Sequence, residues 1–62
     1  TTVETVDIDV KSSLPTKSFM STNQQDFRIF VPLTVLRNGH TLPFLAQEML
    51  EAGDTVKAAV LT

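Results

Sequence analysis

The chain has 62 residues, a formal net charge of −2 at pH 7 and no cysteine. This length fits one domain, residues 1–62, and the lack of cysteine excludes a disulfide framework and a thiolate metal site. Seven acidic residues against five basic ones disfavour a nucleic-acid-binding surface, which is normally basic. We expect an intracellular, cytoplasmic protein, because small secreted domains usually depend on disulfides. No membrane or secretory segment is predicted, since neither a long apolar run nor a basic-then-apolar signal is found.

The first strand is predicted over residues 2–11, where apolar β-branched residues alternate with polar ones. The polar face of this strand carries Asp7 and Asp9, with Glu4 nearby, and the first ten residues contain no basic side chain. The simpler interpretation is a solvated face whose charges discourage pairing between sheet edges. The functional interpretation is an acidic patch that binds a basic surface on a partner.

The segment before the second clear strand is harder to interpret. Residues 12–15 are predicted to form a turn, because Pro15 restricts the backbone on both sides of its peptide bond. A short strand over residues 16–21 and a polar connection over residues 22–26 follow, and a mobile segment is the alternative. In such a strand Phe19 and Met20 would point to opposite faces, so we expect one of them to be exposed.

Residues 27–31 form the most apolar predicted strand, with Phe27, Ile29 and Val31 on one face and Arg28 and Phe30 on the other. Apolar side chains on both faces are typical of a central strand, or of one whose second face meets a partner. Pro32 is expected to end this strand, because it has no N–H for the ladder. Residues 33–37 fit either an extended segment or one helical turn.

Asn38-Gly39 predicts a turn, because both residues tolerate positive φ. This turn either closes a hairpin between residues 35–37 and 40–42 or breaks the chain before a helix. A final strand is predicted over residues 54–62 from the alternation of Val56, Ala58 and Val60 with other residues.

A helix is predicted over residues 41–53, since Leu42, Leu45 and Met49 follow helical spacing. Its start and stop are marked by Thr41 as an N-cap and by Gly53 as a left-handed terminator. We expect this helix to gain its stability by docking on a sheet, because it is too short to be stable alone.

On this predicted helix Phe44 points away from the apolar stripe, toward Glu48 and Glu51. Such a ring is more commonly covered by a neighbouring loop than left exposed. The functional alternative is an exposed partner anchor with an acidic rim.

No motif indicates catalysis. His40 is the only histidine and lies beside the predicted turn, so a surface turn residue is expected rather than a metal ligand. The chain has only two glycines and no phosphate-binding or nucleophile-elbow motif. We therefore expect no enzyme, no cofactor and no metal.

Two segments resemble a known family. Residues 28–37 (RIFVPLTVLR) and 51–60 (EAGDTVKAAV) look like the strand-proline-helix and G-D-x-V strand of AbrB-type swapped-hairpin DNA-binding domains. The resemblance implies a dimeric transcription regulator or antitoxin, in which Arg28, Arg37 and Lys57 from two chains form one basic stripe.

The expected fold is α+β: three or four short, mostly antiparallel strands with the helix at residues 41–53 packed on one face. The expected function is a non-catalytic protein-interaction module that binds and modulates a larger macromolecular machine, such as the transcription apparatus, as a virus-encoded inhibitor would. The AbrB-like regulator is the alternative function, a homodimer is one option, and no membrane partner is expected. The expected partner-binding residues are Phe44, Glu48, Glu51, Glu4, Asp7, Asp9, Phe19 and Phe30.

Overall fold

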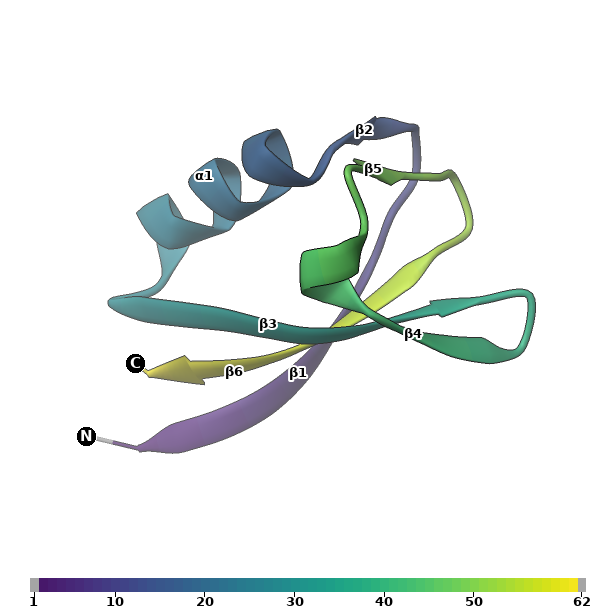
Figure 1. Ribbon diagram of the computed structural model, residues 1–62. Helices are drawn as coiled ribbons and strands as arrows, with labels where there is room; N and C mark the ends of the chain where they lie inside the picture. The colour runs from purple at the N-terminus through teal and green to yellow at the C-terminus, as the bar shows by residue number, and fades with distance from the viewer. Residues whose placement is uncertain (1, 62) are drawn as a thin grey trace.

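The computed structural model describes residues 2–61, which form an antiparallel sheet with one helix packed on one face (Figure 1). In chain order the elements are β1 (Val3–Asp9), β2 (Leu14–Pro15), α1 (Thr16–Asp26), β3 (Ile29–Arg37), β4 (His40–Pro43), the 3₁₀ turn η1 (Phe44–Ala46), β5 (Met49–Leu50) and β6 (Thr55–Leu61). The sheet has the strand order β1-β6-β3-β4, and β2 pairs with β5 in a separate two-stranded sheet. The predicted α+β class is confirmed.

The central strand β6 pairs with β1 on one side and β3 on the other. Its residues Val56, Ala58 and Val60 are buried in the core on the side of the sheet that carries α1, while the alternating positions point to the opposite face. The predicted strands at residues 2–11 and 54–62 are therefore confirmed, with slightly narrower bounds. Residues 1 and 62, which the predicted domain includes, lie outside the described residues.

Strand β3 continues through Pro32, where the sequence predicts its end. β4 pairs only with the last four residues of β3, so on the stretch that contains Pro32 strand β3 is an edge strand, and proline is tolerated there. A register shift between Pro32 and Thr34 inserts Leu33 as a bulge in the pairing with β6. Residues 33–37 are extended, which settles the choice between strand and helical turn.

The turn between β3 and β4 is a two-residue hairpin. Asn38 has φ 52° and Gly39 has φ 79°, and Arg37 pairs with His40 across the turn. Positive φ at both central residues is the condition for this tight hairpin. Of the two interpretations of Asn38-Gly39, the hairpin is correct.

The only α-helix in the described residues, α1, lies where we predicted a strand or a mobile segment, and that prediction is wrong. The side of α1 nearest the sheet is formed by residues 16, 19, 20 and 23, which follow helical spacing. Only Phe19 and Met20 among them are apolar, so the apolar period is too weak to identify the helix. Phe19 is buried and Met20 half-buried, so the two do not point to opposite faces.

The predicted helix at residues 41–53 is also wrong. Pro43 and Gln47 are extended, with ψ 130° and 132°, and leave only the single turn η1 between them. Phe44 and Leu50 both enter the core. In a helix, residues six apart would differ in direction by about 240°, so a bent, mostly extended segment can bury both whereas a helix face cannot. Gly53, with φ 95°, forms part of a turn in which the Asp54 N–H donates to the Glu51 carbonyl at 3.1 Å.

The core is built around all four phenylalanines of the chain. The Phe19 ring lies 6.0 Å from the Phe30 ring and 6.1 Å from the Phe44 ring, measured between centroids. Phe27 stacks on Phe30 at 6.0 Å. Because these rings come from α1, β3, η1 and the connection after α1, they join the helix layer to the sheet.

Candidate functional site

One face of the four-stranded sheet is uncovered by the rest of the described chain. Elements α1, β2, η1 and β5 all lie on the other side of the sheet (Figure 1). We call the uncovered side the open face. It is formed by Val3, Thr5, Asp7 and Asp9 of β1, by Thr55, Lys57, Ala59 and Leu61 of β6, by Ile29, Val31, Thr34 and Leu36 of β3, and by Thr41 and Pro43 of β4.

One end of the open face is apolar. Val3, Ile29 and Val31 are 71%, 52% and 47% exposed, although all three are β-branched hydrophobic residues. Together with Ala59 and Leu61 they line a shallow apolar hollow of about 220 Å³. Contiguous exposed apolar surface of this kind commonly marks an interaction site.

The other end of the open face is mostly polar. Asp7 pairs with Lys57 across β1 and β6, and the Thr55 hydroxyl donates to an Asp9 carboxylate oxygen at 3.2 Å. Within residues 2–61 every ion pair involves Arg37, so Asp7 and Lys57 lie side by side without a closed ion pair. Leu36 adds an exposed apolar side chain to this end.

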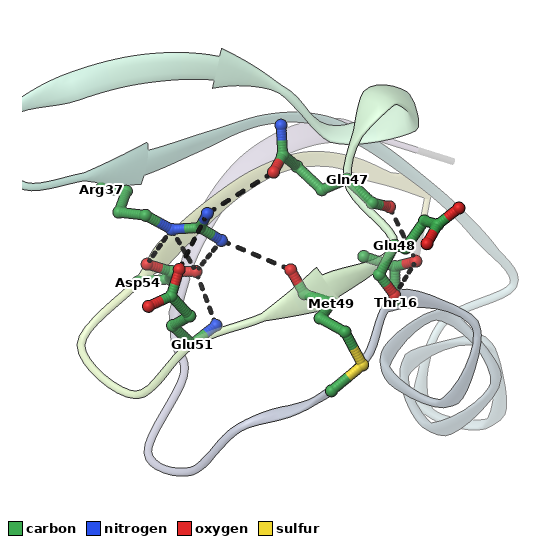
Figure 2. Close-up of polar contacts among 7 residues, drawn as sticks. All are labelled: Thr16, Arg37, Gln47, Glu48, Met49, Glu51 and Asp54. Carbon is green, nitrogen blue, oxygen red and sulfur yellow. Dashed lines mark hydrogen bonds and ion pairs between the residues drawn. The ribbon is translucent and has the colours of Figure 1, made fainter.

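A second polar cluster surrounds Arg37, the last residue of β3 (Figure 2). The Arg37 Nη2 lies 2.7 Å from Asp54 Oδ2, and its Nε lies 3.0 Å from Asp54 Oδ1. Arg37 Nη1 also forms an ion pair with Glu51 at 3.0 Å. Arg37 and Asp54 meet because β3 ends beside the start of β6, which directly follows the turn at Gly53. The cluster also reaches β5, because Arg37 Nη2 lies 3.4 Å from the Met49 carbonyl oxygen.

Asp54 is buried, at 2% exposure, and its carboxylate is fully partnered. Besides Arg37, the Glu51 backbone N–H donates to Asp54 Oδ2 at 2.8 Å. Hydrogen bonding from Arg37 lowers the pKa of Asp54 and outweighs burial, which acts in the opposite direction. The same hydrogen bond raises the pKa of Arg37. This cluster is charged, internally satisfied and well suited to a structural role.

Hydrogen bonds from Thr16 link the start of α1 to the segment between η1 and β5 (Figure 2). Its hydroxyl lies 3.0 Å from the Gln47 carbonyl oxygen and 3.2 Å from that of Glu48. The Thr16 N–H also donates to the Glu48 carbonyl at 3.0 Å. Only the backbone bond satisfies a first-turn N–H of α1, which lacks a side-chain cap, and the hydroxyl bonds add further contacts to this segment.

The expected partner-binding residues do not form one surface. Phe19, Phe30 and Phe44 are core residues, so the expectation that they are exposed partner groups is wrong. The physical reason is that the three rings meet on the helix side of the sheet, where Phe19 of α1 contacts both Phe30 of β3 and Phe44 of η1. The surplus apolar character of β3 is instead exposed at Ile29 and Val31, on the face opposite Phe30.

The five expected acidic residues are exposed but divided between the two sides of the sheet. Asp7 and Asp9 lie on the open face, whereas Glu4 is in register with the buried Val60 and therefore lies on the α1 side. Glu51 pairs with Arg37, and Glu48 borders a hollow beside Lys17. Only Asp7 and Asp9 belong to the open face.

The three cations of the alternative function also lie apart within one chain. Arg28 and Arg37 flank opposite ends of β3, about 30 Å apart at the usual rise per strand residue. Arg37 is bound by Asp54 and Glu51, and Lys57 lies beside Asp7. This arrangement does not favour a basic stripe, and DNA binding stays an untested alternative.

Sequence reasoning named Asp7 and Asp9 but missed the apolar residues of the open face and the Arg37 cluster, for different reasons. The alternation at residues 27–31 does indicate two apolar faces, but it does not show which face α1 covers. No sequence pattern links Arg37 to Asp54, because their contact depends on the register between β3 and β6.

Within residues 2–61, no group of three or more His, Cys, Asp or Glu side chains is placed to hold a metal ion. The described helices include none long and apolar enough to cross a membrane. Comparison with known protein families, curated proteins and solved structures finds no match for the chain. The geometry of the open face is therefore the basis for a functional proposal.

Proposed function

We propose that the chain is a non-catalytic protein-interaction module that docks on a folded protein surface through its open face. The observation that supports this proposal is the exposure of Val3, Ile29 and Val31 side by side on an uncovered sheet. Water around these side chains is released when a partner covers them, and that release favours association.

The arrangement of the face also resembles the anatomy of protein interfaces. A partner can bury the apolar area, and the neighbouring polar and charged groups, such as Asp7 and Lys57, can orient that partner on the face. The face is a hydrogen-bonded sheet rather than a set of loops, so little conformational entropy should be lost when it binds. This surface replaces the one expected around Phe44.

The test is retention of proteins by the immobilised chain from a lysate of its source organism, followed by titration with each purified candidate. Val31→Glu places a charge in the apolar end of the open face. Leu45→Glu is the matched control, because Leu45 is 86% exposed on η1, on the other side of the sheet. We expect a protein that binds the wild type and Leu45→Glu alike, and binds Val31→Glu at least about tenfold more weakly.

The double variant Ile29→Thr/Val31→Thr covers the case in which the new charge unfolds the chain. It keeps both side chains β-branched while making the face more polar. Retention of the same proteins by the wild type and by a folded open-face variant would contradict the proposal, as would the absence of any retained protein.

A further inference from the structure

We infer that the free edge of β1 binds an extended, basic segment of a partner protein, which joins the sheet as an added antiparallel strand. In the strand order β1-β6-β3-β4, β1 has a neighbour on one side only within the described chain (Figure 1). The contacts of this site are backbone hydrogen bonds along the edge, so the inference does not rest on the docking proposed for the open face.

The two edges of the sheet differ in how they are protected from an added strand. At the other edge, β4 has only four residues and ends at Pro43, and the part of β3 that β4 leaves unpaired contains Pro32 and the bulge at Leu33. Short strands, prolines and bulges are the usual features that block the addition of a strand. β1 has none of them, because it pairs with β6 over all seven residues without a register shift and contains no proline and no lysine. An added strand can therefore follow its whole length.

The ladder between β1 and β6 shows which backbone groups of β1 are free. The Val10 N–H, just beyond β1, donates to the Asp54 carbonyl at 2.8 Å and so faces β6. In an antiparallel pair the backbone groups of successive residues point alternately toward and away from the neighbouring strand. Leu61 follows this alternation, because it lies opposite Val3 and its carbonyl accepts the Arg28 N–H at 3.2 Å, on the β3 side. Within β1, the residues after Val3 whose N–H and C=O groups face outward are Thr5, Asp7 and Asp9.

The charge of β1 determines which segment can join it. Its charged residues, Glu4, Asp7 and Asp9, are all acidic and all exposed. A second copy of β1 would bring acidic side chains next to acidic ones, whereas lysine or arginine on the added strand would be attracted. The nearest cation, Lys57, lies on β6 and therefore on the far side of Asp7 from the free edge. Because Asp7 and Asp9 are two residues apart on one face, the best-fitting segment has basic residues at alternate positions.

Between its basic positions, the added strand should carry apolar residues. Val6 and Ile8 lie on the core side of β1 but are only half-buried, whereas Val56 and Val60 on the same side of β6 are buried. Side chains of an added strand that point to this side would lie beside Val6 and Ile8 and cover part of their exposed surface. The predicted partner segment therefore alternates lysine or arginine with valine or isoleucine.

The first test uses a synthetic peptide as long as β1, with seven residues, in which lysine alternates with valine and both ends are blocked. In antiparallel pairing the lysines lie opposite Thr5, Asp7 and Asp9, so their N–H groups point at β1 and those of the valines point away. Fluorescence anisotropy should show that N-methylation at the lysines weakens binding at least about tenfold relative to N-methylation at the valines. The two methylated peptides have the same charge, so general ionic attraction would not distinguish them.

Amide hydrogen exchange locates the bound peptide. In the free chain the outward-facing amides of Thr5, Asp7 and Asp9 should exchange faster than those of Val6 and Ile8, which bond to β6. Saturation with the unmethylated peptide should slow the exchange of Thr5, Asp7 and Asp9.

A charge variant tests the role of the acidic residues. Asp9→Lys should bind the unmethylated peptide about tenfold more weakly, because an attraction is replaced by a repulsion. Asp26→Lys is the matched control, since Asp26 is exposed at the end of α1, and it should change the affinity less than about twofold. Circular dichroism confirms that each variant is folded, and Asp9→Asn, with a smaller expected loss, replaces Asp9→Lys if that variant is unfolded.

The inference would be overturned if the unmethylated peptide did not bind, or if the peptide methylated at its lysines bound as well as the other. Protection confined to residues outside β1 would also overturn it. Equal losses in Asp9→Lys and Asp26→Lys would mean that the peptide responds only to the net charge of the chain. Because none of these measurements depends on Val31, their failure leaves the proposed function standing, and failure of the lysate test leaves this inference standing.

Discussion

The Asp54 carboxylate binds the side of the Arg37 guanidinium at two points, with Nη2 2.7 Å from Oδ2 and Nε 3.0 Å from Oδ1 (Figure 2). This two-point contact joins the last residue of β3 to the residue before β6. It also fixes the turn at Gly53, because Asp54 Oδ2 accepts the Glu51 N–H. A two-point contact between planar groups is among the most directional interactions that side chains make. It should therefore contribute to stability in a way that depends on pH.

The Asp54→Asn variant should be less stable than the wild type by about 2 kcal/mol at pH 7, because the buried partners of the carboxylate lose its charge. In the folded chain the pKa of Asp54 lies below its ordinary value of 3.8. The unfolded chain therefore takes up this proton at a higher pH than the folded chain. The stabilisation is complete above about pH 4 and is lost as the pH falls further, through the lowered pKa.

Urea unfolding of the wild type and Asp54→Asn at several pH values checks this prediction. The difference in free energy of unfolding should narrow below about pH 4, since the unfolded wild type then takes up a proton on Asp54 before the folded wild type does. The other carboxylates are common to both proteins, so their titration largely cancels in the difference. A difference that stays constant down to the acid-unfolding limit would show that the charge of Asp54 contributes nothing.

Phe44→Ala should cost about 3–5 kcal/mol, because it removes a buried ring that contacts Phe19. A loss of this size is comparable to the whole stability of a domain this small, so much of the protein should be unfolded in buffer. Leu45→Ala is the matched control on the neighbouring residue and should change stability by less than about 0.5 kcal/mol. Far-UV circular dichroism during urea titration measures both.

If Phe44→Ala is unfolded in buffer, the milder Phe44→Leu variant still allows the loss of stability to be measured. It should shift the urea midpoint in the same direction by a smaller amount, since it keeps part of the buried volume. Equal stability of wild type and Phe44→Ala would mean that this ring is not part of the core.

The strands of this fold are readable from the sequence where one face is clearly polar. Half-buried residues in β1 and buried residues in β6 alternate mostly with polar or small residues, and Asn38-Gly39 directly encodes the hairpin. Both signals are local. They depend on residues that are neighbours in sequence and not on how the rest of the chain packs against them.

The helix is predicted in the wrong segment because residues 41–53 carry helix signals without forming a helix, whereas α1 carries few of them. Residues 42–49 have helical apolar spacing, but the core needs Phe44 and Leu50, which no single helix face can supply together. The true helix has few apolar residues, and Asn23 on its inner side is satisfied by donating to the Phe19 carbonyl at 2.8 Å. Tertiary contacts decided both segments, which explains why spacing alone failed.

The open face could be only half predicted for a related reason. The sequence indicates that β3 is apolar on both sides, but the side that α1 covers is set by the placement of that helix. The predicted partner-binding residues include Phe30, whereas the structure buries Phe30 and exposes Ile29 and Val31. A wrong position for the helix therefore leaves the buried side of this strand undetermined.

Gly53→Ala should destabilise the protein by about 1–2 kcal/mol, because φ is 95° at this position and side chains disfavour that conformation. A new Cβ would meet no atom within 4 Å, so the cost comes from the backbone and not from a clash. Gly53→Asn should cost less, since asparagine adopts positive φ more readily. Thermal unfolding of the three proteins checks this order, and equal losses for alanine and asparagine would contradict it.

Thr16→Val should cost about 1 kcal/mol, because valine matches the shape of threonine but cannot donate to the Gln47 and Glu48 carbonyls. Thr22→Val is the matched control, since Thr22 lies exposed on the same helix and the change is chemically identical. Thr16→Ser should keep most of the stability, because it keeps the hydroxyl. Urea unfolding measures the difference, and amide hydrogen exchange should show faster opening at the start of α1 in Thr16→Val alone. If Thr16→Val and Thr22→Val behave alike, the hydroxyl does not fasten the helix to the segment before β5.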